Sequence, residues 1–359
     1  MDAAPALATI RAHKDRLFDI TVCLRPFRAA GPRLDTEMIG DTLVVHNYGH
    51  GGSGWSLSWG SGTIAVKKAM ERSPREIAVI GCGALGLTTA ILAQRAGAQV
   101  TIYCKDLVQQ ARSARASGVW TPDSRIALAS AAGPAFGALW EEMARTSWKT
   151  YRSYLGLPGN PIEFKDRYAL YDGTPPAGLS EPPGSLDFAA YGNRIADLTP
   201  RSVVLQGADV PFPVPFARRS STLQFNVHAY ADKLLGDFHV AGGKIERREF
   251  HEAGEFARLP QKVVINCTGY GARALMRDDS IVPVRGQIGW LIPQPEVNYG
   301  FFYRDVSVVS RSDGIVVQWI AGGDMFGYGD DHEVVDRAEA ERGVGVLEEL
   351  YSRVSPNSV

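Results

Sequence analysis

The chain has few cysteines, almost no charge imbalance and no long apolar run. Its four cysteines, Cys23, Cys82, Cys104 and Cys267, are scattered along 359 residues and form no CxxC pair. Such spacing indicates reduced, buried side chains rather than a disulfide framework or a zinc site. The formal net charge of −1 gives no electrostatic reason to bind a nucleic acid or another polyanion.

Features of membrane, secreted and metal proteins are also missing. No apolar stretch approaches the roughly 20 residues that a membrane-spanning helix needs. The first eighteen residues, MDAAPALATIRAHKDRLF, lack the apolar segment of a signal peptide. No paired-histidine or carboxylate spacing argues for a metal. We therefore expect a cytoplasmic protein that acts on a small molecule, without metal, membrane or nucleic-acid partner, and the sequence leaves a homodimer open.

Short β-branched runs alternate with helical stretches along most of the chain, and the length favours two domains. Strands are predicted over 19–24, 42–46, 76–80, 99–103, 244–250, 262–266, 281–292, 306–310 and 315–320, and helices over 54–72, 85–96, 139–154, 228–241 and 336–353. Residues 160–219 are proline-rich, and we expect irregular structure with short strands there. No linker separates two sequential domains, so we expect the domains to interleave.

A glycine-rich segment, GCGALG (residues 81–86), joins a predicted strand to a predicted helix. In this context Gly81 allows a tight turn, Gly83 lets the backbone approach a pyrophosphate, and Gly86 lets the helix pack closely on the strand. The helix N-terminus offers free N–H groups to the phosphates. The segment therefore predicts a dinucleotide site, and Asp106 stands about where a carboxylate would bind ribose hydroxyls. These residues alone suit NAD as well as FAD.

A second glycine-rich segment, HNYGHGGSGWSLSWG (residues 46–60), precedes the first. The loop from Gly49 to Gly54 has too little side chain to be there for packing, and it opens a predicted helix. Such a loop places backbone groups against a flat ligand, and the helix N-terminus stabilises negative charge on that ligand.

Five segments together resemble the D-amino-acid oxidase family of flavoenzymes. They are CLRPFRAAGPRLD (23–35), HNYGHGGSGWSLSWG (46–60), SARASGVWTP (113–122), VVINCTGYGARAL (263–275) and PVRGQ (283–287). In that family the first two of these segments stand at the C-terminal end. Here they stand first, and a short link at residues 67–75 joins them to the dinucleotide segment. The order predicts a circular permutation, with Met1 and Val359 near each other in the substrate domain.

The resemblance implies an α/β fold in which a Rossmann-like FAD-binding domain interleaves with an α+β substrate domain built on a mixed sheet. We assign residues 36–121 and 218–278 to the FAD-binding domain. Residues 1–35, 122–217 and 279–359 are assigned to the substrate domain.

The resemblance also implies FAD as the cofactor and a set of site residues. Arg25 would clamp the substrate carboxylate, and the Gly52 carbonyl would accept a hydrogen bond from the substrate amine. Tyr303 matches the first member of a tyrosine pair whose second place is Ser307 here. The residues expected at the cofactor are Gly49, Gly51, Gly52, Ser53, Gly54, Trp55, Ser56, Gly81, Gly83, Ala84, Leu85, Gly86, Lys105, Asp106, Ser113, Gly118, Val119, Trp120, Thr121, Phe250, Cys267, Thr268, Gly269 and Arg285.

Other polar residues are expected to be structural. Arg28 and Arg33 should form salt bridges, and His46 and His50 should hold the glycine loop, because the implied chemistry needs no side-chain base. Asp123 is expected to cap a turn.

The implied reaction is oxidation of a D-amino acid. A hydride passes from Cα to flavin N5, water converts the imine to a 2-oxo acid and ammonia, and dioxygen reoxidises the flavin to give hydrogen peroxide. The short span from Gln287 to Tyr303 predicts a reduced lid and an open site. Three alternatives stay open: a biosynthetic flavin amine oxidase acting on a modified amino acid or secondary amine, an NAD(P)-dependent dehydrogenase, and a catalytically inactive flavin-binding protein.

Overall fold

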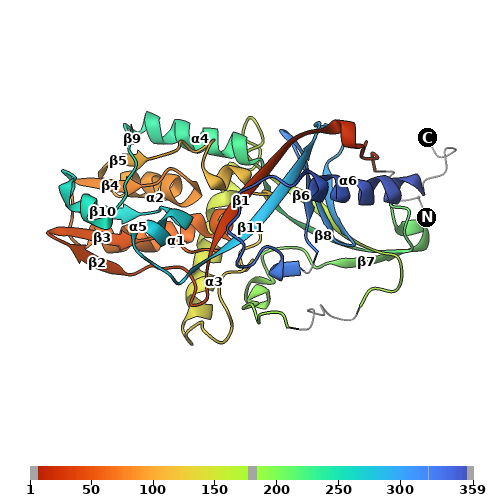
Figure 1. Ribbon diagram of the computed structural model, residues 1–359, viewed down its shortest axis with the longest axis horizontal. Helices are drawn as coiled ribbons and strands as arrows, with labels where there is room; N and C mark the ends of the chain where they lie inside the picture. Colours follow the sequence, from red (N-terminus) through yellow and green to blue (C-terminus); the bar gives the residue numbers. More distant parts are fainter. Residues whose placement is uncertain (1–6, 177–183, 322, 354–359) are drawn as a thin grey trace.

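Two sheets lie next to each other along the long axis of the molecule, with the longest strands crossing between them (Figure 1). The computed structural model describes residues 7–176, 184–321 and 323–353. Met1 and Val359, whose proximity the permutation predicts, lie outside the described residues.

The first sheet has six strands and is mostly parallel. Its order is β2 (Thr36–Ile39), β3 (Thr42–His46), β10 (Val263–Asn266), β4 (Glu76–Ile80), β5 (Gln99–Cys104) and β9 (Lys244–Arg247). Only the edge pair β2–β3 is antiparallel. The central strands are rich in Val and Ile and show no apolar–polar alternation, because both of their faces are buried.

Helices cover both faces of this sheet. On one face lie α1 (Gly54–Met70), α2 (Ala84–Arg95), α3 (Phe136–Tyr151) and α4 (Val227–Val240), which share one hydrophobic core with it. The other face packs against Phe256 and the short helix α5 (Ala272–Leu275).

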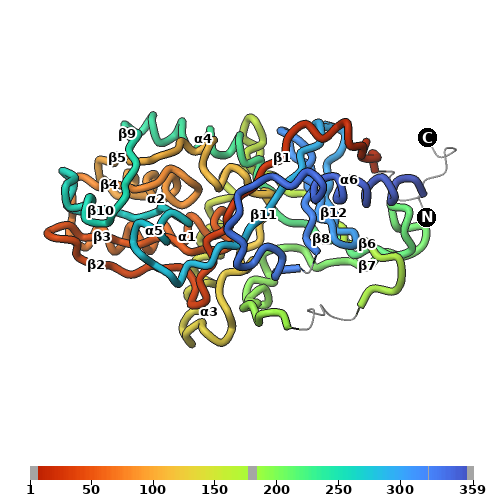
Figure 2. Tube along the Cα trace, in the orientation of Figure 1, coloured from red at the N-terminus to blue at the C-terminus, as the bar shows by residue number. Residues whose placement is uncertain are grey.

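The second sheet has eight strands of mixed direction. Its order is β1 (Leu17–Arg28), β11 (Ile281–Leu291), β14 (Gly314–Trp319), β13 (Val306–Arg311), β12 (Tyr299–Tyr303), β6 (Ile162–Tyr171), β8 (Phe216–Phe225) and β7 (Val203–Gln206). Helix α6 (Arg337–Ser352) covers one face through Val344, Leu347 and Leu350. On the opposite face Ile288, Trp290, Val309 and Val316 pack together, and the two sheets lie beside each other (Figure 2).

Short 3-10 helices complete the chain. They are η1 (Lys14–Arg16), η2 (Arg112–Arg115), η3 (Arg152–Tyr154), η4 (Gly192–Ile195), η5 (Gly207–Asp209), η6 (Ala253–Arg258), η7 (Gly269–Gly271) and η8 (Gly323–Met325).

The two sheets divide the chain differently from the assigned domains at two places. Helix α3, assigned to the substrate domain, packs on α1, where Gly60 N donates to Ser147 Oγ at 2.9 Å. Strand β8, assigned mostly to the FAD-binding domain, belongs to the eight-stranded sheet.

Four strands were not expected, namely β2, β6, β8 and β12. Of these, β6 and the start of β8 lie where irregular structure with short strands was predicted, and each of the two runs for ten residues. Strand β6 reads IEFKDRYALY, and its charged middle breaks the apolar alternation that marks a strand. Its partners β8 and β12 supply the hydrogen bonds that fix it as a strand.

The link expected at residues 67–75 is shorter in the structure, because residues 67–70 still belong to α1. Helix α1 ends at Met70 and β4 begins at Glu76, with Ser73 at a φ of 46° in the turn. At the other sheet, Tyr299 Oη donates to Ala8 O at 2.6 Å and lies 3.0 Å from Tyr351 Oη near the end of α6. Ala8 and Tyr351, near the two ends of the described chain, thus both contact Tyr299 of the eight-stranded sheet.

Among the helices of the described chain, none combines the length and the apolar character needed to cross a membrane.

Candidate functional site

A cavity of about 650 Å³ lies between the two sheets, at the carboxyl ends of β4, β5 and β10. Ligands of open α/β sheets bind at this edge, and cofactor sites measure roughly 300–1,000 Å³. The cavity walls come from both glycine-rich segments, from η2 and from β1.

The turn after β4 is shaped by close backbone contacts. Gly81 has a φ of 103°, and a β-carbon there would lie 2.6 Å from Cys267 O. A β-carbon on Gly86 would lie 1.9 Å from Gly81 O, so α2 can start this close to β4 only with glycine. Gly83 caps α2, whose first N–H, on Ala84, donates to Ser113 Oγ at 3.1 Å. This turn fits a pyrophosphate held at a helix N-terminus.

The end of β5 forms one end of the cavity. Lys105 and Asp106 line it together with Phe250. Lys105 Nζ pairs with Glu249 Oε1 at 2.7 Å on the rim. A carboxylate beside this strand end suits the ribose of a dinucleotide.

The loop before α1 forms the other end. Gly51 N donates to Pro26 O at 2.8 Å, and Gly52 N donates to Ser124 O at 3.0 Å. A β-carbon on Gly51 would lie 1.9 Å from Arg125 O. The loop is therefore held between β1 and the segment at Ser124, and its backbone faces the cavity next to Arg25.

The cavity brings most of the expected cofactor residues together. Those that line it are Gly51, Gly52, Gly54, Trp55, Gly81, Gly83, Ala84, Leu85, Lys105, Asp106, Ser113, Phe250, Cys267, Thr268 and Gly269, together with Arg25. Those outside the lining are Gly49, Ser53, Ser56, Gly86, Gly118, Val119, Trp120, Thr121, Arg285 and Tyr303.

Two serines outside the lining hold the wall in place. Ser56 Oγ accepts from Thr121 N at 2.9 Å, and Ser53 Oγ donates to Thr121 O at 3.1 Å. These bonds tie the segment at Thr121 to α1. Ser56 accepts the bond from Thr121 N and keeps its own hydroxyl proton to donate, so its expected contact with the flavin stays a prediction.

Sequence reasoning missed several lining residues. Arg112 and Arg115 of η2 line the cavity, and Glu333 reaches it from the loop before α6. Arg112 Nη2 lies 2.5 Å from Glu333 Oε2, and the Arg112 guanidinium lies 5.3 Å from the Tyr270 ring centre. Both arginines lie in or next to the segment that resembles the flavin loop, whereas nothing in the sequence marks Glu333.

Arg25 is half-buried at the glycine-loop end of the cavity. Its Nη1 donates to Arg285 O at 3.3 Å. A β-carbon on Gly286 would lie 2.3 Å from both terminal nitrogens of Arg25, so the guanidinium lies directly over this glycine. Among the described residues no carboxylate lies within 4.0 Å of it. Arg25 is therefore available to an anionic ligand.

The Arg285 side chain points to the opposite face of the sheet. It is buried, and its Nη1 pairs with Glu339 Oε2 of α6 at 2.9 Å. Neighbouring residues of a strand alternate between faces, so the register that places Gly286 under Arg25 sends Arg285 toward α6. Arg285 thus anchors α6 and does not reach the cavity expected for it.

Tyr303 is also on the α6 face. Its hydroxyl donates to Asp172 Oδ2 at 2.9 Å, and its ring belongs to the core under α6. Tyr303 therefore points away from the cavity, because strand alternation groups it with Tyr299 and Phe301. Ser307, across the sheet in β13, faces the other way.

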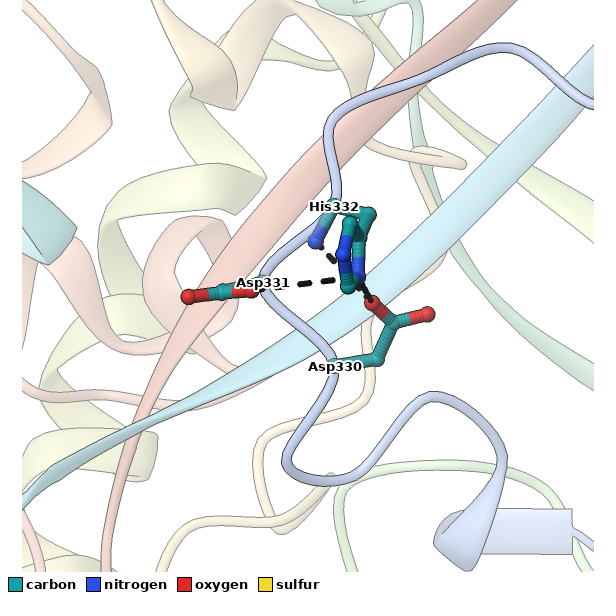
Figure 3. Close-up of side chains that lie close together, drawn as sticks. All are labelled: Asp330, Asp331 and His332. Atoms are coloured by element: carbon teal, nitrogen blue, oxygen red, sulfur yellow. Dashed lines mark hydrogen bonds and ion pairs between the residues drawn. The ribbon is translucent and has the colours of Figure 1, made fainter.

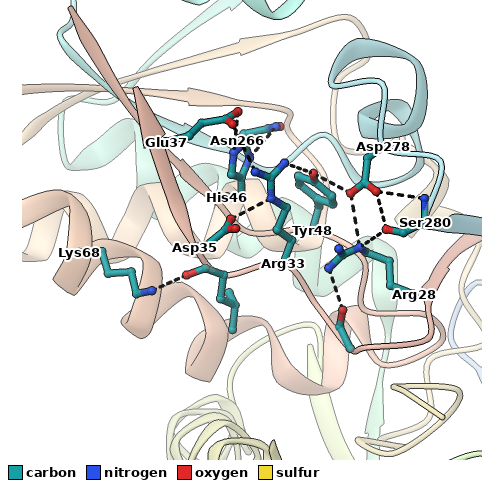
Figure 4. A network of polar contacts seen from close by, with 12 residues as sticks. Arg28, Arg33, Asp35, Glu37, His46, Tyr48, Lys68, Asn266, Asp278 and Ser280 are labelled. Carbon is teal, nitrogen blue, oxygen red and sulfur yellow. Dashed lines mark hydrogen bonds and ion pairs between the residues drawn. The ribbon is translucent and has the colours of Figure 1, made fainter. Parts of the chain in front are cut away.

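The two histidines of the glycine loop differ. His46 Nε2 lies 3.0 Å from Glu37 Oε1, and its Nδ1 lies 3.3 Å from Asn266 Nδ2 (Figure 4). His46 therefore links the end of β3 to β2 and β10, and its expected role in holding the loop stays a prediction. His50 is also buried, but neither of its ring nitrogens has a partner among the described residues. Burial lowers the pKa of His50 to about 3.

Arg28 and Arg33 are structural, as predicted. Arg28 Nε donates to Ser280 Oγ at 2.9 Å, and Arg33 Nε donates to Asp35 Oδ1 at 2.8 Å (Figure 4). Their partners connect the start of β11 with the residues around β2 and leave neither guanidinium in the cavity lining.

Within the described chain one group of residues has the types and spacing of metal ligands. Asp330, Asp331 and His332 lie on the loop before α6, with ligand atoms within 4.8 Å of one another (Figure 3). His332 Nδ1 lies 2.8 Å from Asp330 Oδ1, and His332 O accepts from Arg285 Nε at 3.1 Å. These contacts shape the loop, whose side chains are largely exposed.

The site defines a dinucleotide-dependent oxidoreductase. Its glycine turn lies at the carboxyl ends of a parallel sheet, and its cavity continues to a second sheet that is largely antiparallel. The chain belongs to the family of FAD dependent oxidoreductases (DAO), whose family model matches residues 76–357. FAD is thus the cofactor, and the glycine turn, the cavity and its two ends fit this group. The NAD(P) alternative is set aside by this match. The match starts at β4 and leaves residues 1–75 outside it.

Two relatives are D-amino-acid oxidases. The chain is 30% identical over 216 residues to that of Streptomyces coelicolor (59% of this chain, 58% of the relative) and 30% identical over 219 residues to that of Rubrobacter xylanophilus (58% and 57%). The chain thus spans somewhat over half the length of these relatives. The structure of glycine oxidase from Bacillus cereus is similar with a TM-score of 0.49 and 15% identity, covering 77% of each chain.

Proposed function

We propose that this protein is an oxidase that removes a hydride from the α-carbon of a D-amino acid or a related amine. The observation that carries the proposal is the Arg25 guanidinium, which lacks a carboxylate partner among the described residues and lines the same cavity end as Gly52. An amino acid carries a carboxylate and an amine a few ångströms apart. The carboxylate suits the Arg25 guanidinium, and the amine suits the backbone at Gly52.

Each residue at this end has a distinct task. Arg25 would hold the substrate carboxylate through its planar guanidinium, which matches a carboxylate better than lysine does. The Gly52 carbonyl would accept a hydrogen bond from the neutral amine. FAD, when bound, supplies the acceptor for the hydride. The residues of the chain therefore act by alignment and electrostatics rather than by proton transfer.

The proposed reaction balances with dioxygen and water as its co-reactants. The substrate loses two electrons and two protons in forming the imine, and dioxygen accepts both to give hydrogen peroxide. Water then adds to the imine carbon, and ammonia leaves to give the 2-oxo acid. With residues 1–75 preceding the part that matches the family, we also propose that the family fold is circularly permuted here.

A related candidate is an oxidase for a modified amino acid or a secondary amine. The connection between β11 and β12, residues 292–298, is short, and Tyr303 is turned away from the cavity. A site without this tyrosine accepts bulkier amines more readily than a closed one.

Anaerobic mixing of the purified holoenzyme with D-amino acids, L-amino acids, glycine and N-methyl amines tests these proposals. Bleaching of the flavin absorbance band by an amine, with peroxide formed on admission of air, supports the oxidase. If no amine reduces the bound flavin, the oxidase proposal fails and the inactive flavin-binding alternative gains support. The Arg25→Ala variant should retain FAD and lose substrate affinity, and loss of FAD instead would make Arg25 structural.

A further inference from the structure

The face of the eight-stranded sheet that carries Arg25 continues across several strands. Gly286, under the Arg25 guanidinium, shares its face with Ile288 and Trp290, because alternate residues of a strand point the same way. Ile288 and Trp290 pack against Val309 of β13 and Val316 of β14. Ser307, two residues before Val309, therefore lies on the same face as Arg25.

A second guanidinium reaches this face from β6. Arg167 Nη2 donates to Ser307 Oγ at 3.3 Å, and the guanidinium lies 4.4 Å from the Phe302 ring centre. The Arg167 side chain is buried, and its Nε has no partner among the described residues. Burial lowers the pKa of Arg167 to about 10, which still leaves it charged at neutral pH.

Comparison with the other buried arginines shows what Arg167 lacks. Arg125 Nη2 lies 3.1 Å from Asp324 Oδ1, Arg285 Nη1 lies 2.9 Å from Glu339 Oε2, and Arg311 pairs with Asp313. Arg167 has one long hydrogen bond to a neutral hydroxyl and no carboxylate within 4.0 Å in the described part of the chain. A buried charge without a counter-ion is strongly unfavourable. A fixed guanidinium of this kind is completed by an anionic ligand, which it can bind through two parallel hydrogen bonds.

The distance between the two guanidinium groups can be worked from the sheet. Ser307 pairs with Gln318, and the β11–β14 register continues from Gly289–Val317 to place Ile288 beside Gln318. Ser307 is thus two strands across and two residues along from Gly286, which is roughly 12 Å at the usual strand spacing and rise. A chain of a few carbon atoms between two carboxylates covers this distance, although Arg167 and Ser307 lie beyond the residues that line the cavity.

We propose that Arg167, oriented by Ser307 and Phe302, binds a second carboxylate of the substrate, so that the enzyme favours D-amino acids with an acidic side chain. The inference rests on the proposed function, since it places the α-carboxylate on Arg25. It also accounts for Ser307 at the place of a tyrosine. A serine at this place leaves space for Arg167 to reach across β12, whereas a tyrosine ring would fill it.

The test compares acidic substrates with their neutral isosteres. Initial rates of peroxide formation are measured for D-aspartate, D-glutamate and D-2-aminoadipate against D-asparagine and D-glutamine, in the wild type, Arg167→Met, Arg167→Lys and Arg219→Met. Arg219 is an exposed arginine of the neighbouring strand β8 and serves as the matched control. We expect kcat/KM for at least one diacid to exceed that for its amide in the wild type by at least tenfold. Arg167→Met should lower the diacid value about a hundredfold and change the amide value by less than threefold.

Binding and stability give readouts that do not depend on turnover. Titration of the holoenzyme with glutarate, followed by the flavin difference spectrum, should show at least tenfold weaker binding in Arg167→Met and no change in Arg219→Met. The Tm of Arg167→Met should equal or exceed that of the wild type, because an unpaired buried charge is removed. Arg167→Lys keeps the charge and should recover part of the diacid preference.

Several outcomes would overturn the inference. If the wild type oxidises amides as well as diacids, or if Arg167→Met affects both classes equally, Arg167 is not a substrate-binding residue, although the oxidase proposal stands. Failure of Arg167→Met to fold, with Arg167→Lys showing wild-type stability and no change in diacid preference, makes Arg167 structural. Absence of flavin reduction by every amine refutes the oxidase proposal itself.

Discussion

Replacing Gly286 by alanine should disable Arg25 without touching the FAD end of the cavity. The new methyl group would lie 2.3 Å from both terminal nitrogens of Arg25, well inside van der Waals contact. A flexible side chain gives way before a strand does, so we expect the guanidinium to move off the sheet and lose its position for a carboxylate. Gly286 lies in the middle of β11 and does not line the cavity itself.

The size of the effect follows from the hydrogen bonds that Arg25 would make. Hydrogen bonds to charged groups contribute about 1.5–3 kcal/mol each. Loss of about 3 kcal/mol for the pair corresponds to a fall of roughly a hundredfold in kcat/KM. FAD content, measured from the absorbance of the purified protein, should equal that of the wild type.

The same strand supplies the control. Gly289 faces α6, where a β-carbon would lie 3.0 Å from Leu17 Cδ1, so Gly289→Ala should leave kcat/KM within about twofold. The double variant Arg25→Ala/Gly286→Ala should be no worse than Arg25→Ala alone, because both changes remove one interaction. Wild-type kcat/KM in Gly286→Ala, or additive losses in the double variant, would refute the assignment of the substrate carboxylate to Arg25.

Three further results are expected. Gly86→Ala would bring a methyl group 1.9 Å from Gly81 O and should yield protein without bound FAD, seen as loss of the visible absorbance; a yellow variant would contradict the close contact of α2 with β4. The pKa of His50 falls to about 3 on folding, so as the pH drops below 6.5 the unfolded chain binds a proton before the folded one does. The free energy of unfolding should therefore be about 2 kcal/mol lower at pH 5 than at pH 7. Urea unfolding at pH 7 and pH 5 checks this, and His50→Gln should show a smaller difference between the two pH values. Glu339→Gln removes the nearest anion of the buried Arg285 and leaves Asp330 Oδ2 at 4.0 Å from its Nε. It should destabilise the protein by about 3 kcal/mol in urea unfolding, whereas loss of less than 1 kcal/mol would show that the pair is solvated.

The sequence predicts the parallel sheet well because each of its central strands is fully buried. Strands β3, β4 and β10 appear as short segments rich in Val and Ile, and glycines mark the turns that follow them. The eight-stranded sheet is harder, since the burial of its residues depends on partners far away in the chain. Strand β6 carries Lys165, Asp166 and Arg167 in succession, and this charged run conceals a strand that β8 and β12 hold in place.

The candidate site shows the same difference between features that the local sequence determines and features that depend on distant strands. Backbone requirements, such as those at Gly81 and Gly86, leave glycines in the sequence that can be read directly. The direction of a side chain depends on register, and the resemblance could not give it for Tyr303 and Arg285, both of which point to α6. The absence of a counter-ion at Arg167 could not be predicted either, because it is a property of three strands together.

The position of β10 has a consequence for synthesis. Four strands of the six-stranded sheet, together with α1 and α2, lie within residues 36–104. Most of this sheet therefore leaves the ribosome as one local unit. Its central strand does not, since β10 at Val263–Asn266 must enter between β3 and β4. Until it does, these two strands present unpaired edges, which are the parts of a sheet most prone to join another chain. The nascent protein is therefore most vulnerable to aggregation while residues 105–262 are being made.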